Sequence, residues 1–256
     1  MGQVTLQRDG PVARITLDDP ERLNAMSVSM WTALADAVAA VDADHAMRVV
    51  VLRGAGDRAF VSGANISEFG TLRNSPEATR AYDAAVAGAQ GALQRCRVPV
   101  IAAISGVCYG GGLGLALSCD LRHASPSARF RMPAARLGLG YAYDNVRTLL
   151  AQLGPLAAAE AFYTARVYDA QGAARIGIVG SVVDDVFAHC EALAAEIAAN
   201  APLTVQAGKL ALRAALAGST QLDAVHEAIA ACFRSSDYAE GRLAFAEKRP
   251  PQFTGR

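Results

Sequence analysis

Three consecutive glycines, Gly110 to Gly112, interrupt an apolar part of the chain and restrict how it can fold. An apolar run at Val98 to Ile104 precedes them, and small and apolar residues follow at Leu113 to Ser118. A short, continuous apolar run is typical of a strand buried on both faces, and the small residues after the glycines suit a packed helix. A strand, a glycine loop and a helix in this order predict α/β architecture, with the unpaired N–H groups of a helix N-terminus beside the loop.

The remaining strand and helix patterns support the same architecture. Apolar or alternating runs predict strands at Val4 to Leu6, Val12 to Leu17, Val49 to Leu52 and Ser127 to Met132. The first two flank the turn dipeptide Asp9-Gly10, which predicts a β-hairpin. Between the hairpin and the third strand, apolar positions from Val28 to Val41 share one helical face, and Ser27 precedes them as an N-cap.

The chain after Met132 is predicted to be mostly helical, and its last sixty residues all-helical. Turn signals divide it at Gly154-Pro155, Gly177 to Gly180, Ala201-Pro202 and Gly218. Alanine-rich segments at Leu193 to Ala199 and Leu210 to Leu216 bury little area by themselves, so they need a partner surface. We therefore expect a core over residues 1–195 and a helical oligomerisation region over residues 196–256.

Composition excludes several classes of partner. The 256 residues carry 24 basic and 24 acidic side chains, so no strong field attracts nucleic acid or an anionic membrane. The sequence has no signal-peptide pattern and no run of about 18 uncharged apolar residues, which predicts a cytoplasmic protein without a membrane segment. The five scattered cysteines suit reduced core thiols, and the four histidines show no metal-ligand spacing, so no metal is expected.

Another loop, earlier in the chain, also exposes backbone amides; it is called the first loop, and the Gly110 to Gly112 loop the second. The segment from Phe60 to Phe69 follows the Val49 to Leu52 strand, and its Gly63 and Ala64 have almost no side chain to shield an N–H group. Two such loops together predict a pair of donors for one developing oxyanion. Nucleotide-binding explanations of the glycines fit poorly, because a Walker loop needs Gly-Lys-Ser/Thr and a dinucleotide fingerprint needs a small residue in place of Leu115.

Both loops resemble those of the crotonase superfamily, the enoyl-CoA hydratase/isomerase family. The first loop reads SGANISE where the family usually has approximately AGADIKE, and similarity extends to DDPERLNAM at Asp18 to Met26 and SDYAEGRLAFAEKRPPQF at Ser236 to Phe253. The resemblance covers nearly the whole chain. It implies an α/β spiral of ββα units with a C-terminal helical trimerisation region, an acyl-CoA substrate, no cofactor beyond coenzyme A, and a homotrimer or a dimer of trimers.

The resemblance also assigns site residues. It implies an oxyanion hole formed by the amides of Ala64 and Gly111. It further implies that coenzyme A is bound by Arg22, Ala64, Asn65 and Ile66. Phe245 and Lys248 are implied to reach the nucleotide bound to a neighbouring subunit. The lysine of the family's first loop is Ser67 here.

The chain departs from the family where a hydratase does its chemistry. A hydratase holds water between two glutamates, and the corresponding positions are Gly114 and Ala134. The acid of dienoyl isomerases aligns with Ala142. None of these three side chains moves a proton, so standard hydratase activity is not expected.

Tyr141 and Asp144 are the remaining candidates near the second loop. Asp144 fits either a catalytic base or the N-cap of a helix at Val146 to Leu153. Tyr141 lies where methylmalonyl-CoA decarboxylases of the superfamily have a tyrosine, although their first-loop histidine is Ala64 here. Three functions therefore stay open: an acyl-CoA enzyme that stabilises a thioester enolate, a carboxyacyl-CoA decarboxylase or thioesterase that uses Tyr141 and Asp144, and a coenzyme A-binding protein without catalysis.

Overall fold

Two sheets form the centre of the computed structural model, which describes residues 2–64 and 75–256. The six-stranded sheet contains β1 (Gln3–Asp9), β2 (Val12–Asp18), β3 (Val49–Gly54), β5 (Val100–Ile104), β7 (Leu121–Ala124) and β10 (Ser181–Val182), in that order. The four-stranded sheet contains β4 (Ala59–Val61), β6 (Val107–Tyr109), β8 (Arg129–Arg131) and β9 (Tyr168–Asp169). Neighbouring strands pair parallel, except that β1 with β2 and β8 with β9 pair antiparallel.

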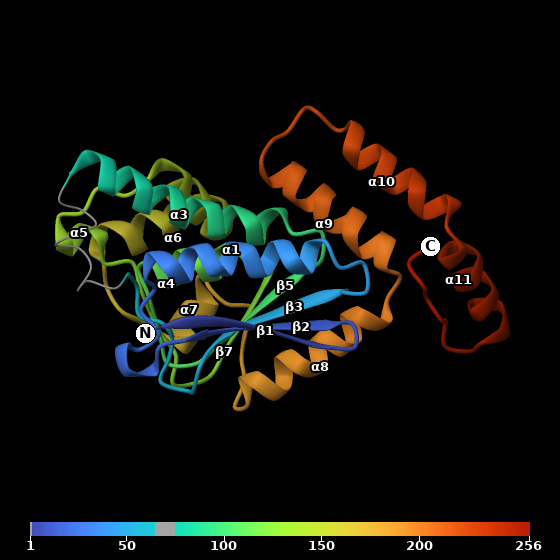
Figure 1. Ribbon diagram of the computed structural model, residues 1–256, viewed down its shortest axis with the longest axis horizontal. Helices are drawn as coiled ribbons and strands as arrows, with labels where there is room; N and C mark the ends of the chain where they lie inside the picture. Colours follow the sequence, from blue (N-terminus) through green and yellow to red (C-terminus); the bar gives the residue numbers. More distant parts are fainter. Residues whose placement is uncertain (1, 65–74) are drawn as a thin grey trace.

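The chain passes between the two sheets in a repeated way. Strands β3, β5 and β7 lie in the larger sheet, and the next strand of each, β4, β6 or β8, lies in the smaller one. Helices α3 (Pro76–Arg95) and α4 (Gly111–Leu117) follow the first two pairs, and α5 (Ala134–Leu137) and α6 (Tyr143–Thr164) follow the third. The predicted spiral of ββα units is therefore confirmed (Figure 1).

The N-terminal predictions are also confirmed. Strands β1 and β2 form the expected hairpin, with Asp9 paired to Val12. Helix α1 (Val28–Asp42) begins after Ser27, whose hydroxyl accepts a hydrogen bond from the Met30 N–H at 3.2 Å. Most of the predicted apolar face of α1, including Trp31, is buried, and the face packs into the main core beside α3.

Several predicted boundaries are wrong. Helix α4 begins at Gly111 and not at Leu113, because Gly110 at φ +52° is the N-cap and the glycines form the first turn. Strand β8 is shorter than Ser127 to Met132. The break at Gly154-Pro155 is a kink inside α6, where Gly154 has φ +74°. The chain beyond α6 also contains β9 and β10, which the mostly helical prediction missed because each is two residues long.

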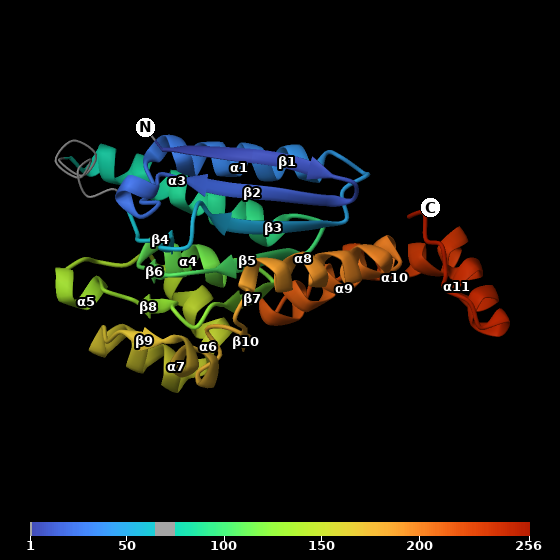
Figure 2. The same cartoon turned by 90° about the horizontal axis from the view of Figure 1, so that it is seen from below.

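The C-terminal third is helical, as predicted, up to a non-helical tail after residue 247. After α7 (Ala170–Arg175) it contains α8 (Val186–Ala199), α9 (Pro202–Leu216), α10 (Asp223–Arg234) and α11 (Ser236–Glu247). Helix α8 packs on the larger sheet, so the boundary predicted after residue 195 falls inside a helix of the core. Helices α10 and α11 extend away from the sheets (Figures 1 and 2).

A partly buried ionic cluster attaches α9 to the core. The Asp120 carboxylate accepts from Lys209 Nζ and from Arg213 Nη2, both at 2.8 Å. Lys209 is buried, and its Nζ also donates to the Val98 carbonyl at 2.8 Å. Because the buried Lys209 charge is paired and hydrogen-bonded, it is compensated in the folded state, and the cluster joins α9 to the core.

The cysteines are all unpaired thiols, and four of them are buried. Burial raises the pKa of the Cys119 thiol to about 12, which keeps it protonated. No helix in the described ranges combines the length and apolar character needed to cross a bilayer. Within residues 2–64 and 75–256, no group of three or more His, Cys, Asp or Glu side chains is arranged to hold a metal ion.

Candidate active site

The glycine cluster forms the N-terminal turn of α4. Gly110 has a positive φ, and its N–H donates to the Arg131 carbonyl of β8 at 2.9 Å. The first helical hydrogen bond runs from the Gly114 N–H to the Gly110 carbonyl at 3.0 Å. The N–H of Gly111 therefore has no partner within the helix and is available to a ligand.

The first loop meets this turn. Gly63, at φ +125°, accepts a hydrogen bond from the Met26 N–H at 2.9 Å, which fixes the backbone just before Ala64. A Cβ atom placed on Gly111 would lie 4.0 Å from the Ala64 nitrogen and 3.3 Å from Cζ2 of Trp31. The two loops thus converge as the sequence predicts. Their shared use as an oxyanion hole stays a prediction, because it depends on a bound thioester.

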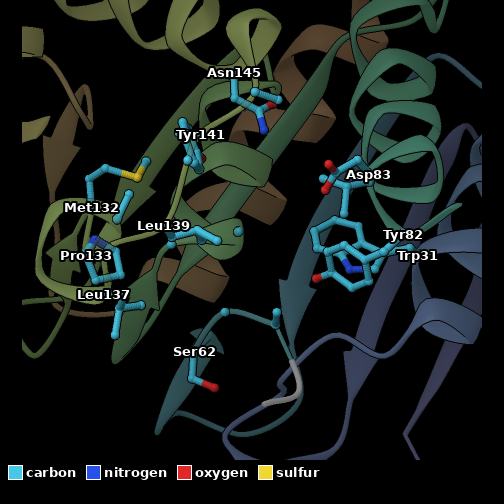
Figure 3. Close-up of a pocket in the computed structure, with 18 residues that line it drawn as sticks. Trp31, Ser62, Tyr82, Asp83, Met132, Pro133, Leu137, Leu139, Tyr141 and Asn145 are labelled. Atoms are coloured by element: carbon cyan, nitrogen blue, oxygen red, sulfur yellow. The ribbon is translucent and has the colours of Figure 1, made fainter. Parts of the chain in front are cut away.

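A cavity of about 160 Å³ opens at the junction of the two loops. Its described lining comes from both loops, from α1 and α3, and from the segment between β8 and α6. Figure 3 shows Trp31, Tyr82 and Asp83 on one side and Met132, Leu139 and Tyr141 on the other. The walls are mainly apolar, which suits an acyl group.

Gly114 and Ala134, to which the resemblance assigns the two catalytic glutamates, have no acidic side chain. Ala134 is buried and lines the cavity, while Gly114 is buried in the first turns of α4. Among the described lining residues the only carboxylate is that of Asp83, on an exposed position of α3. The sequence reasoning missed Asp83.

Tyr141 lies at the cavity, as its candidate role requires. The residue is half-buried, and its ring contacts that of Phe162 with centroids 5.9 Å apart. Burial, with a smaller contribution from Tyr82, raises the pKa of the Tyr141 hydroxyl above its ordinary value. The hydroxyl is therefore a neutral hydrogen-bond donor at physiological pH and not a base.

Asp144 does not lie among the described residues of the cavity wall. Its side chain is 75% exposed and pairs with Arg147 Nη2 at 3.3 Å. The N-cap prediction is wrong, because α6 begins at Tyr143 with Ala142 as its N-cap, one turn earlier than the predicted start. The role of Asp144 as a base stays a prediction, without support from its position.

The predicted coenzyme A residues lie in two distant places. Arg22, in the short helix η1 (Pro20–Arg22), is beside the first loop, because its carbonyl accepts from the Ser62 hydroxyl at 3.2 Å. Asn65 and Ile66 lie outside the described residues. Phe245 and Lys248, at the end of α11, are at the opposite end of the molecule from α4 and α5 (Figure 1). They can contact the nucleotide only across a subunit contact.

Helix α3 supplies a wall that the sequence reasoning did not assign. Tyr82, Val86 and Gln90 are buried at four-residue spacing, which is typical of one helical face. That spacing was visible in the sequence, but it gave no indication that the face borders the glycine loops. Two buried N–H donors near the glycines of α4 have no hydrogen-bond partner: Trp31 Nε1 and Gln90 Nε2.

Comparison with known proteins agrees with the fold and identifies a family. The family described as Enoyl-CoA hydratase/isomerase matches residues 7–256. A short-chain-enoyl-CoA hydratase of Clostridium acetobutylicum is 32% identical over 97% of this chain and 96% of that protein. A crotonyl-CoA hydratase of Syntrophomonas wolfei is 31% identical over 99% and 98% of the two chains. A crystal structure of an enoyl-CoA hydratase/carnithine racemase from Magnetospirillum magneticum superposes with a TM-score of 0.95 at 40% identity, covering 100% of this chain and 97% of the other.

Proposed function

The chain belongs to the enoyl-CoA hydratase/isomerase family, and from this premise we propose an acyl-CoA enzyme that stabilises a thioester enolate without the glutamates of a hydratase. The observation that carries the proposal is the convergence of the two loops, with the Ala64 nitrogen 4.0 Å from a Cβ on Gly111. Two backbone donors at one point stabilise negative charge on a thioester oxygen without any side chain.

The absence of acids from the two glutamate positions limits the reaction. Hydration needs one group to take a proton from water and another to deliver or orient a proton at the alkene carbon. Gly114 and Ala134 do neither. The proposed enzyme therefore stabilises an enolate and does not add water as a hydratase does.

Acetoacetyl-CoA tests the oxyanion hole independently of the true reaction. Its enolate absorbs in the ultraviolet, so an oxyanion hole raises the enolate absorbance when protein is added at fixed pH. We expect a rise that saturates with protein. No change in absorbance, with binding demonstrated by calorimetry, would reject the oxyanion hole.

A parallel assay with crotonyl-CoA tests the hydratase reaction itself. Loss of the enone absorbance of crotonyl-CoA at the rate of a family hydratase would show that the missing glutamates are dispensable.

Decarboxylation is the second candidate, and the position of Tyr141 favours it. In this reaction the bond between the α carbon and the carboxylate breaks, its electron pair forms the enolate, and carbon dioxide leaves. A proton from solvent or from the Tyr141 hydroxyl then completes the product. The leaving group generates the enolate itself, so the protein needs only an oxyanion hole and a proton source.

A panel of malonyl-type thioesters tests the second candidate. Release of carbon dioxide identifies decarboxylation, and release of free thiol identifies thioester hydrolysis. Neither product from any member would exclude both reactions. Asp144→Asn and Tyr141→Phe, assayed on the same panel, test the predicted roles of these two side chains.

We also propose that the chain assembles as a homotrimer or a dimer of trimers. Large apolar side chains of the C-terminal helices are exposed, among them Phe233, Leu243 and Phe245, the last at 88%. Exposed apolar side chains at this density are typical of an interface. Light scattering should give three or six times the mass of 26.6 kDa, and Phe245→Ser should weaken both assembly and coenzyme A binding.

A further inference from the structure

A cavity lined by three arginines lies between α3, α6 and α9. Arg95 is the last residue of α3, Arg147 is in the first turns of α6, and Arg213 is near the end of α9. The cavity volume is about 260 Å³, several times the share of about 30 Å³ that one water molecule has in the liquid. This basic cavity and the acyl cavity have no described lining residue in common. The two cavities are therefore separate.

A chain of hydrogen bonds joins the helices that form the basic cavity. Gln94 Nε2 donates to Thr148 Oγ1 of α6 at 3.4 Å and to Ser118 Oγ, at the end of α4, at 3.5 Å. Arg213 Nη2 donates to the Ser118 carbonyl at 3.1 Å. The hydroxyls of Ser118 and Thr148 donate to carbonyls of their own helices. These bonds fix the walls and occupy the hydroxyl donors, so guanidinium N–H groups are the main donors left for a ligand.

Arg95 is the most available of the three arginines. Within residues 2–64 and 75–256, its guanidinium has no hydrogen-bond acceptor and no carboxylate partner. The group lies against Gly91, where a Cβ would be 2.7 Å from its Nη1. The absent side chain of Gly91 thus leaves room for the guanidinium beside the helix. All of its N–H donors can be used by a ligand.

The charges at the basic cavity do not balance. No Asp or Glu occurs among the described residues that line it. Arg213 pairs with Asp120 at 2.8 Å, but the same carboxylate also pairs with Lys209. Arg147 pairs with Asp144 at 3.3 Å, and both side chains are mostly exposed, so this ion pair contributes little. The cavity therefore has an excess of positive charge, although the 24 basic and 24 acidic side chains of the whole chain balance.

The arrangement suits a phosphate dianion. Guanidinium groups bind phosphate oxygens through charge-assisted and often paired hydrogen bonds. The oxygens of a phosphate point in several directions, so arginines from three different helices can bind it together. A dianion also reduces the repulsion among the arginines.

We propose that the basic cavity is a phosphate-binding site, formed by Arg95, Arg147 and Arg213, for the free ion or for the phosphoryl group of a small molecule. The inference does not depend on the thioester chemistry of the acyl cavity. A ligand held there connects α3, α6 and α9, and it stabilises the folded protein because the unfolded chain has no such site.

Calorimetry with inorganic phosphate at constant ionic strength tests the site. The titration is made without and with saturating coenzyme A, because the site for the phosphates of coenzyme A is filled in the second case. We expect saturable binding of one phosphate per chain in both cases. Arg95→Gln and Arg147→Gln should each weaken it by about tenfold, the loss expected for charge-assisted hydrogen bonds. Arg213 is left unchanged, because it also pairs with Asp120.

Arg80→Gln is the matched control. Arg80 is on the same helix as Arg95, is 72% exposed, pairs with Glu77 at 2.9 Å and does not line the basic cavity. Its substitution removes the same charge and should change phosphate affinity by less than about twofold. Phosphate should raise Tm in the wild type and in Arg80→Gln, and raise it less in Arg95→Gln.

Four outcomes would overturn the inference. They are no saturable binding by the wild type, loss of phosphate binding when coenzyme A is added, equal weakening in Arg80→Gln and Arg95→Gln, and a changed mass by light scattering with unchanged phosphate affinity in Arg95→Gln. The last would mean that a second copy of the chain covers the arginines. Methyl phosphate that binds as tightly as inorganic phosphate would support a phosphoryl group as the ligand, and weaker binding of methyl phosphate would support the free ion.

Discussion

The two ends of the cavity are built from different parts of the protein. At the oxyanion end, the backbone nitrogens of Ala64 and Gly111 come from two loops whose form depends on glycines within each loop. At the other end, Tyr141 lines the cavity from the segment before α6, and it lies beside Gly114 and Gln90, which are not among the described lining residues. The backbone donors at the first end can keep their function while the side chains at the second end change, because backbone donors tolerate different neighbouring side chains. We therefore expect the second end to decide the reaction.

Removing one N–H at the oxyanion end should have the largest effect. Gly111 is the first residue of α4, where proline is compatible with a helix. Gly111→Pro removes the N–H, and we expect kcat to fall by about 10²–10³, the usual cost of one oxyanion-hole donor. Steady-state kinetics on the true substrate, or the acetoacetyl-CoA enolate absorbance, measures the loss.

Gly111→Ala is the control for this substitution, because it keeps the N–H and adds a methyl group 3.3 Å from the Trp31 ring. It should retain much more activity than the proline variant. Equal losses in both variants would mean that the shape of the loop matters and the donor does not, and the contrast between the two ends would disappear.

Restoring the family glutamate at the other end should cost stability. In Gly114→Glu the new Cβ would lie 2.7 Å from Gln90 Nε2, which is overpacking, and we expect a loss of about 1–3 kcal/mol of unfolding free energy. Chemical denaturation measures it. Gln90→Ala should relieve much of the loss in the double variant, with a coupling of about 0.5–3 kcal/mol. Additive effects would show that Gln90 does not occupy the space of the glutamate.

The approach of the two loops could be predicted from sequence because its determinants are local. Gly63 and Gly110 need positive φ, and each is adjacent in sequence to the nitrogen it places. The spiral of ββα units could be predicted for the same reason, since each apolar strand and glycine loop is a continuous segment. The boundary errors, such as the start of α4, arise because glycine also forms a helical turn when its neighbours are packed.

The side-chain end could only be predicted in part. The resemblance to the family predicts Tyr141 as a site residue. It does not predict Gln90 or Asp83, because α3 comes near the cavity only in the folded chain. Asp144 is not among the described residues of the cavity wall, because proximity in sequence to Tyr141 does not imply the same direction. Position 144 is in the first turn of α6 and faces solvent, where Arg147 pairs with it.

A pair of carboxylate variants sharpens the comparison further. We expect Asp83→Asn to lower kcat about tenfold. This is a modest part of the rate enhancement that a general acid or base at the cavity contributes. Asp144→Asn should change kcat by less than about twofold, because exposed ion pairs contribute little. Steady-state kinetics of both variants at the same pH makes the measurement. The reverse order of effects would restore Asp144 as the base.

The smallest effect is expected from pH, because Tyr141 should act as a neutral donor. Its pKa is raised above the ordinary value of 10.0, first by burial and then by Tyr82. The folded state therefore keeps the proton when the unfolded chain loses it, so unfolding free energy is unaffected below pH 10 and falls as pH rises above it. Activity that depends on the hydroxyl should accordingly be flat between pH 7 and pH 10.

Tyr141→Phe should remove part of the alkaline loss of stability, whereas Tyr163→Phe, at a side chain that is 76% exposed, should not. An activity that increases between pH 7 and pH 9 in the wild type and not in Tyr141→Phe would mean that the phenolate acts as a base, and the side-chain end would then supply the proton acceptor that the missing glutamates do not.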